Sequence, residues 1–224
     1  MIYYVGNKKI KISDDELYDN YIDEGSEVEV FRFDDKVFKL YKPYCNKGRL
    51  DENTINKLKN INTKRIIMPD NTIKDSSSKL IGYTMPYIDS YGIDGFKNIK
   101  IKNLIDELNI IKNDLLILSK NKIDIEDIHI GNILLGDGLY FVDPGSYRVS
   151  GFKEHLLYSL NKYTINIFVL NDILKRFSNI SIKNKKVLEE LIPVDDEYIG
   201  DILDYDNMNN LNIKEYVNTK LKSR

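Results

Sequence analysis

The sequence predicts an α+β fold, in which antiparallel strands come first along the chain and helices follow. Residues 21–41 alternate apolar and polar side chains with a period of two, which is typical of half-buried strands. Beyond residue 100, apolar residues instead recur every three or four positions, as on one face of a helix. We therefore expect a sheet plus one helix over residues 1–86 and a helical part over residues 87–224, in one large domain or two small lobes.

The composition narrows the class of protein. The chain has 224 residues, of which 42% are hydrophobic and 30% charged, as expected for a folded globular protein. The formal net charge of −2 gives no overall attraction to nucleic acid or to an anionic membrane, so neither is expected as a partner. Cys45 is the only cysteine, which excludes an internal disulfide.

The N-terminus lacks the charged-then-apolar order of a secretory signal, and no apolar run reaches the roughly eighteen residues of a membrane-spanning helix. We therefore expect a cytoplasmic protein. Delivery into another cell by a signal-less secretion route is the alternative.

Turn residues place two hairpins in the N-terminal part of the chain. Residues 2–12 alternate loosely, which indicates a small hairpin or an extra edge strand, and Ser13 then suits the cap of a short helix. Residues 21–41 form a second antiparallel set with Gly25 and Ser26 in its opening turn.

Other elements follow from the same patterns. Strands are expected at residues 65–69 and 79–88, with a polar turn between them. Two long helices are each expected to bury one face, because apolar residues recur at steps of four and three. These residues are Leu104, Leu108, Ile111, Leu115 and Leu118 in the first helix, and Leu156, Leu160, Tyr163, Ile167, Leu170 and Leu174 in the second.

The stretch with the most chemistry lies between residues 125 and 147. Asp127 is followed five positions later by Asn132, then by two short apolar strands around a Gly-Asp-Gly turn, and then by Asp143. A hairpin holds the residues at its open end close together, so we expect these three side chains to converge. A carboxylate that orients a hydroxyl, together with two oxygen ligands for Mg²⁺, is what phosphoryl transfer requires. Asp127 suits the first role, and Asn132 and Asp143 suit the second.

The D-x-x-x-x-N, strand pair and D-x-G arrangement resembles the catalytic loop of the protein-kinase-like superfamily. The resemblance implies a two-lobed protein-kinase-like fold, here with a reduced helical C-terminal lobe, and ATP and Mg²⁺ as cofactors. A β-hairpin with solvated aspartates at its ends is the alternative explanation of the pattern.

The resemblance extends to residues expected at the nucleotide. Val37 and Lys39 match the end of the kinase V-A-I-K strand, which implies that Val37 packs on adenine and Lys39 holds phosphates. A surface lysine is the alternative for Lys39. The turn at Gly25 and Ser26 matches a glycine-rich phosphate loop only in part, with Val30 at its closing valine position.

A glutamate is expected to pair with Lys39. Glu52 lies on the inward side of a helix predicted over residues 49–61, where kinases place this partner, so the resemblance assigns it a catalytic role. Asp51 is the rival, and a solvent-exposed acid in the first turn of a helix is the structural alternative.

The strand over residues 79–88 resembles the one that leads into the kinase hinge. The resemblance places Met85 beside adenine and gives the Pro86 carbonyl and the Ile88 amide the bonds to its edge. It also includes Leu134, in the strand after Asn132, among the nucleotide-binding residues. An ordinary core strand is the alternative.

Two departures from the kinase pattern bear on function. The loop reads D-I-H-I-G-N, so His129 resembles the histidine of aminoglycoside phosphotransferases; it would stabilise the transferred phosphoryl group, orient Asp127, or serve structure alone. Pro144 replaces the phenylalanine of D-F-G and little chain is left for an activation segment, which favours a minimal kinase that is active by default.

The expected reaction is ATP- and Mg²⁺-dependent phosphoryl transfer to a hydroxyl on an unidentified protein substrate. A small-molecule kinase of the aminoglycoside or choline type is one alternative. A nucleotide-binding module without catalysis and an AMP-transferring variant of the fold are the others.

Overall fold

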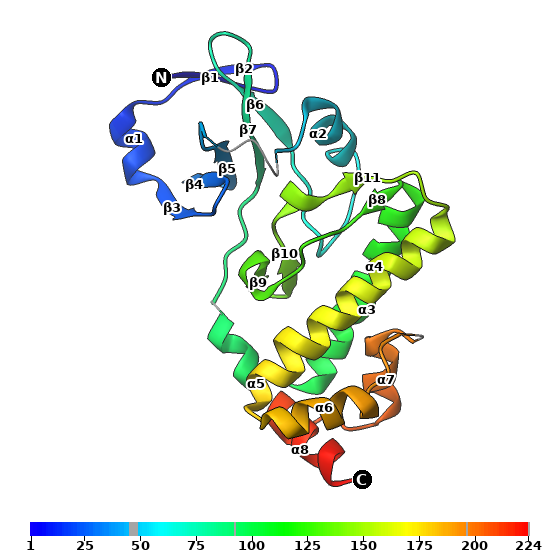
Figure 1. Cartoon of the computed structure of the whole chain (residues 1–224). Helices are drawn as coiled ribbons and strands as arrows, with labels where there is room; N and C mark the ends of the chain where they lie inside the picture. The colour runs from blue at the N-terminus through cyan, green and yellow to red at the C-terminus, as the bar shows by residue number, and fades with distance from the viewer. Residues whose placement is uncertain (45–48, 92, 196, 224) are drawn as a thin grey trace. The chain divides into compact units, whose positions relative to one another are not determined.

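The computed structural model describes residues 1–44, 49–91, 93–195 and 197–223, so Cys45 lies outside the described residues. The chain divides into two compact units (Figure 1). The first comprises Met1–Thr63, Ile67–Asp89 and Asp143–Tyr147, and the second comprises Lys64–Ile66, Ser90–Val142 and Arg148–Arg224. Each unit is therefore built from more than one stretch of the chain, whereas the sequence predicts a single boundary between residues 86 and 87.

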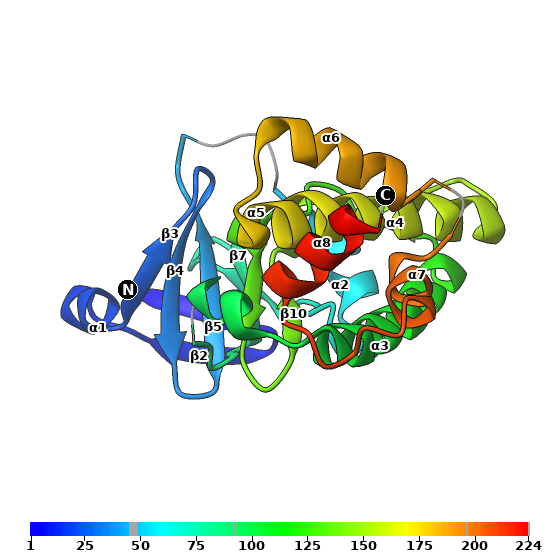
Figure 2. The ribbon, with the colours of Figure 1, turned by 90° about the horizontal axis from the view of Figure 1, so that it is seen from below.

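A seven-stranded antiparallel sheet forms the first unit, in the order β2-β1-β6-β7-β5-β4-β3. Figure 2 shows β3, β4 and β5 side by side in this sheet. The strands are β1 (Ile2–Val5), β2 (Lys8–Lys11), β3 (Tyr21–Glu24), β4 (Val28–Phe33), β5 (Lys36–Tyr41), β6 (Asn71–Lys74) and β7 (Leu80–Pro86). Helices α1 (Asp14–Asp19) and α2 (Glu52–Leu58) belong to the same unit. The α+β class and both N-terminal hairpins are thus confirmed.

The start of α1 follows the expected chemistry. Ser13 accepts a hydrogen bond from the Glu16 amide, and the Glu16 carboxylate accepts one from the Ser13 amide at 2.8 Å. This reciprocal capping satisfies two backbone donors that the first helical turn leaves unpaired.

The two faces of the first-unit sheet carry different residues. On β5, Phe38 points to the face where Tyr3, Ile12 and Ile73 form a buried apolar cluster. Lys39 points to the opposite face, because successive side chains alternate across a strand. The N-terminal hairpin and α1 contribute to the core on the Phe38 face, which leaves the Lys39 face for other contacts.

The strand expected at residues 65–69 is absent, and β6 forms instead within the expected turn. The reason is Asp114, a side chain only 1% exposed in the middle of a helix of the second unit. Its carboxylate accepts the amides of Lys64, Arg65 and Ile66 at 3.0, 2.6 and 3.1 Å. Backbone donors held by a carboxylate are not available to a strand ladder. Ile66 accordingly forms only an isolated bridge to Phe141, and the strand β6 begins at Asn71.

Helices dominate the second unit. They are α3 (Ile101–Lys120), α4 (Glu154–Phe168), α5 (Arg176–Ser178), α6 (Ile182–Leu191), α7 (Ile199–Tyr205) and α8 (Ile213–Lys222), with a π-helical segment at Val169–Lys175. Short strands accompany them, namely β8 (Ile123–Asp124), β9 (Ile133–Leu135), β10 (Leu139–Phe141) and β11 (Arg148–Val149). The apolar stripe predicted for α3 is confirmed, because its five members are all fully buried.

The stripe predicted for the second long helix is wrong in its first half. Leu156, Leu160 and Tyr163 are 48, 43 and 45% exposed, whereas Leu170 and Leu174 are buried. Helix α4, which packs against α3 (Figure 1), buries the face that carries Leu157. The π-helical segment then adds a residue to the turn, which rotates the later positions toward the core.

Among the residues that the structure describes, no helix is long and apolar enough to cross a membrane.

The Asp114 anchor leads to a stability prediction. Asp114→Ala should lower the free energy of unfolding by roughly 3 kcal/mol, because three backbone amides, one of them buried, lose their shared acceptor. Urea denaturation followed by circular dichroism measures this loss. Asp106→Ala is the matched control, since Asp106 is an exposed acid on the same helix and should change stability by less than about 0.5 kcal/mol. Equal stability of the two variants would contradict the claim that Asp114 stabilises the fold through these hydrogen bonds.

Candidate functional site

Four residues predicted to surround a nucleotide share one face of the first-unit sheet. Val30 pairs directly with Lys39 across β4 and β5, and Val37 pairs with Met85 across β5 and β7. Residues opposite one another in antiparallel strands point to the same side. The register therefore places a buried lysine among apolar neighbours, because Val37 and Met85 are only 9 and 2% exposed.

Lys39 forms an ion pair with Asp143. The Lys39 Nζ atom lies 2.9 Å from Asp143 Oδ1, and the two side chains are 10 and 36% exposed. Asp143 Oδ1 also accepts the Gly145 amide at 3.4 Å, as the short 3₁₀ turn Pro144–Ser146 begins. Within the described residues Asp143 Oδ2 makes no hydrogen bond. That oxygen is consequently free to bind a cation.

Tyr83 adds an uncharged neighbour to this pair. It lies opposite Lys39 on β7 and is 1% exposed. Burial raises the pKa of Tyr83 well above its ordinary value, and the charge of Asp143 raises it further. Tyr83 therefore stays protonated and adds no negative charge beside Lys39.

The expected pairing of Lys39 with Glu52 is wrong. Glu52 Oε1 instead bonds Lys74 Nζ at 2.6 Å, and the Glu52 side chain is 45% exposed. Glu52 is the first residue of α2, which begins after the Asp51 cap and lies beside β6, the strand that ends at Lys74. A charge in the first turn of a helix is stabilised there without any role in a site.

The turn at Gly25 and Ser26 joins β3 to β4 as expected, closed by a 2.9 Å bond from the Gly25 amide to the Val28 carbonyl. A Cβ atom at position 25 would meet only Val28 Cγ2, at 3.8 Å. The fold of the hairpin therefore does not itself require glycine here. A glycine would be required at this position if a ligand came so close to the backbone that no side chain could fit.

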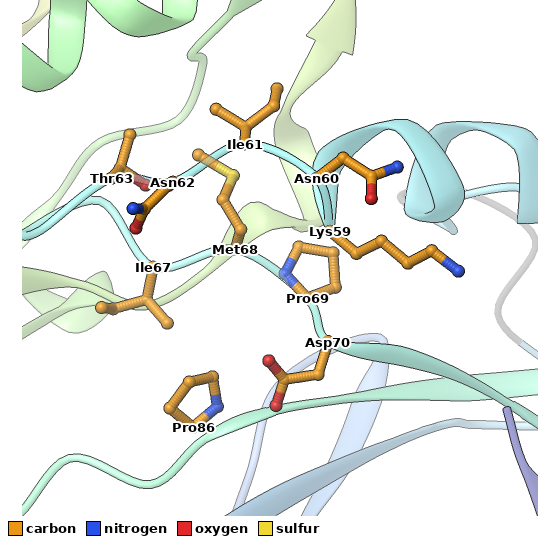
Figure 3. A pocket seen from close by; sticks show the side chains of 10 residues that line it. All are labelled: Lys59, Asn60, Ile61, Asn62, Thr63, Ile67, Met68, Pro69, Asp70 and Pro86. Atoms are coloured by element: carbon orange, nitrogen blue, oxygen red, sulfur yellow. The ribbon is translucent and has the colours of Figure 1, made fainter.

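The expected hinge residues end β7. Pro86 pairs with Lys36 in the sheet register, and the next amide, of Tyr87, donates to the Asp35 carbonyl at 2.8 Å. Figure 3 shows Pro86 at the edge of a pocket of about 320 Å³. The other lining residues are Lys59, Asn60, Ile61, Asn62, Thr63, Ile67, Met68, Pro69 and Asp70. Half-buried Ile88 follows two residues later.

In the second unit the structure brings Asp127 and Asn132 together. Asn132 Nδ2 donates to the Asp127 carbonyl at 3.0 Å, which leaves Asn132 Oδ1 without a partner in the described residues. Asp127 has a φ of 56°, in the left-handed region that a non-glycine residue adopts only when other contacts hold it. Its carboxylate is 71% exposed and thus open to a substrate.

His129 is oriented toward Asp127. Its Nδ1 atom accepts the Gly131 amide at 3.1 Å, so in the neutral ring the proton lies on Nε2. That Nε2 atom is 4.0 Å from Asp127 Oδ1. This separation is too long for a hydrogen bond, but the ring nitrogen that carries the proton is the one near the carboxylate, which suits an orienting role.

The hairpin predicted after Asn132 is confirmed. Ile133 pairs with Phe141 at its open end, and the Val142 amide donates to the Asn132 carbonyl at 3.0 Å. Half-buried Leu134 lies in β9, opposite Tyr140. The bond from the Val142 amide holds Asn132 at the open end of the hairpin.

The sequence did not indicate the residues that brace this hairpin. Glu107 on α3 bonds Arg65 Nε at 2.5 Å and accepts the Leu139 amide at 2.9 Å. Arg65 also donates to the Tyr140 hydroxyl at 2.8 Å. Glu107 stands next to the α3 stripe, but its partners lie far away in sequence, so no local pattern reveals them.

A divalent cation would find only part of its coordination in the protein. Across the residues that the structure describes, no three His, Cys, Asp or Glu side chains gather as a metal site. Mg²⁺ needs few protein ligands, because it binds through one or two of them together with waters and substrate phosphates. Taken singly, the oxygen without a partner on Asp143 in the first unit, and the one on Asn132 in the second, are each of the kind that Mg²⁺ binds.

Comparison with known proteins yields structural likeness only. No family model matches the sequence, and no curated protein matches it. Among solved structures, the crystal structure of the Mycobacterium tuberculosis PknI kinase domain matches with a TM-score of 0.54 and 10% sequence identity. The match covers 92% of this chain and 94% of that one. At this identity the likeness bears on the fold alone.

Asp124, three residues before Asp127, leads to a pH prediction. Burial raises the pKa of its carboxyl, Glu126 raises it further, and Arg148 lowers it. A raised folded-state pKa means that stability falls as the pH rises from the ordinary carboxyl value through the folded value. Asp124→Asn should therefore unfold at a higher temperature than wild type at pH 7.

Well below about pH 4 the difference should disappear, because Asp124 is then protonated in both the folded and the unfolded chain. Thermal unfolding across this range is the measurement. A variant less stable than wild type at neutral pH would show that the ionised carboxylate is favourable.

Proposed function

Because the chain has a protein-kinase-like fold, we propose that it is a phosphotransferase that moves the γ-phosphoryl group of ATP, with Mg²⁺, to a hydroxyl on a protein. The observation that carries the proposal is the ion pair between Lys39 and Asp143. A buried lysine paired with a carboxylate on a largely apolar face suits nucleotide binding. Phosphate oxygens can replace the carboxylate as the partner of the ammonium group, and the carboxylate can then bind a metal ion.

The nucleotide is proposed to lie against the Lys39 face of the sheet. Val30, Val37 and Met85 would pack on adenine, with Leu134 as a further apolar contact. The Pro86 carbonyl and Ile88 amide would bond the edge of the ring. The backbone at Gly25 and Ser26 would approach the phosphates, since the hairpin itself places no demand on glycine.

The chemical roles follow from the charge of Lys39 and from the side-chain oxygens that have no partner. Lys39 would bond phosphate oxygens, and the uncommitted oxygens of Asn132 and Asp143 would hold Mg²⁺. Bound Mg²⁺ would neutralise the phosphates and favour charge transfer to the leaving group. Asp127 would accept a hydrogen bond from the attacking hydroxyl, while His129 would keep that carboxylate in position.

A small-molecule kinase is the second candidate, and His129 is the observation that favours it. The D-x-H-x-x-N pattern resembles that of aminoglycoside phosphotransferases. Incubation with γ-labelled ATP and a proteome extract, in parallel with sugars, cholines and aminoglycosides, separates the two acceptors. Label on polypeptide supports the protein kinase, and label on a small molecule supports the alternative. Intact mass of the product distinguishes added phosphate from added AMP.

Lys39→Ala should lower kcat/KM for ATP about 10²- to 10³-fold, as expected when one charge that stabilises the transition state is removed. Release or transfer of labelled phosphate measures the effect. Lys36→Ala is the matched control, because Lys36 lies on the same strand, points to the other face and bonds Asp70 at 2.7 Å.

Thermal unfolding of both variants checks that they are folded. An equal loss of turnover in the two variants, or none in Lys39→Ala, would refute the role given to Lys39.

A further inference from the structure

The first unit contains a pocket of about 620 Å³ on the face of the sheet that carries Phe38. It lies between the β1–β2 hairpin and the turn that joins β4 to β5. Lys39 points to the opposite face, so this pocket is separate from the nucleotide site proposed above. The argument that follows is independent of that proposal.

Five of the twelve residues that line the pocket are apolar. They include Phe38, which is 7% exposed, and the partly buried residues Val5, Ile10 and Phe33. All four belong to the apolar cluster under the N-terminal hairpin or pack against it. The cluster thus opens to solvent at this point.

Three neutral polar residues also line the pocket, namely Asn7, Asn71 and Thr84. Asn71 and Thr84 lie directly opposite each other on β6 and β7, so both point into the pocket face. Thr84 is 2% exposed, and neither side chain forms a hydrogen bond within the described residues. The Thr84 hydroxyl is not among the fully buried polar atoms without a partner, so it reaches the pocket and can bond a molecule there.

The charged residues at the rim indicate which kind of molecule the pocket can bind. Lys8 and Lys36 stand beside Asp34 and Asp35, so cations and anions are equal in number. Lys36 is moreover engaged by Asp70. The rim therefore favours neither an anion nor a cation.

We propose that this pocket binds a small, neutral, largely apolar molecule with one hydrogen-bonding group, directed at Asn71 and Thr84. Ligand pockets of proteins typically enclose about 300–1,000 Å³ and combine apolar walls with a few placed polar groups. A pocket of 620 Å³ with this lining matches both properties. The N-terminal hairpin, which the phosphotransfer proposal does not use, forms one wall of the site.

N-phenyl-1-naphthylamine is a suitable probe, because it is neutral and apolar, has one N–H donor, and fluoresces in apolar surroundings. Titration of the whole protein should show saturable binding of one molecule per chain. Ile10→Trp, which fills the pocket, should weaken binding at least tenfold. Ile22→Trp is the matched control, because Ile22 lies on β3, outside the pocket, and is 47% exposed.

Thr84→Val tests the polar group without a change of volume. It should weaken binding about five- to tenfold, the value of one hydrogen bond, and should not lower the unfolding temperature, since the hydroxyl has no protein partner. The proposal is overturned if binding is not saturable, or if wild type and the two pocket variants bind the probe equally.

Discussion

The ion pair between Lys39 and Asp143 is the constraint on which the first unit depends. An ammonium group with so little exposure needs a counter-charge, and here the counter-charge comes from 104 residues further along the chain. The pairing draws residues 143–147 into a unit otherwise built from the first 89 residues. The return of that distant segment thus supplies a counter-charge to a lysine on the apolar face of the sheet.

The alternation of side chains along β5 gives the sheet two different surfaces. Phe38 completes an apolar cluster under the N-terminal hairpin, whereas Lys39 meets a carboxylate on the other side. The same strand thus stabilises the unit through one face and presents charge on the other. This division allows two separate binding sites on one sheet, one proposed for a nucleotide and one for a neutral small molecule.

Local patterns predicted much of this structure. The hairpins, the Ser13 cap and the buried stripe of α3 depend on residues close in sequence, and each is confirmed. The errors have non-local causes. Asp114 accepts hydrogen bonds from backbone amides of a predicted strand. Lys74 forms an ion pair with Glu52, the residue that was expected to pair with Lys39.

The stripe of α4 failed for a different reason. Its spacing is helical throughout, but a π-helical segment changes the phase after Phe168, so Leu156 faces solvent while Leu170 is buried. For the candidate site, spacing predicted that Val30, Val37, Lys39 and Met85 share a face and that Asp127 and Asn132 meet. It could not reveal Arg65 and Glu107, whose contacts exist only in three dimensions.

The central claim is that Lys39 and Asp143 hold the phosphates of ATP with a magnesium ion between protein and nucleotide. Calorimetric titration of wild type and Asp143→Asn with ATP, with and without Mg²⁺, tests it most directly. The account predicts that Mg²⁺ tightens ATP binding to wild type and that this gain is lost in the variant. Absence of ATP binding to wild type, or a gain from Mg²⁺ that persists in Asp143→Asn, would contradict it.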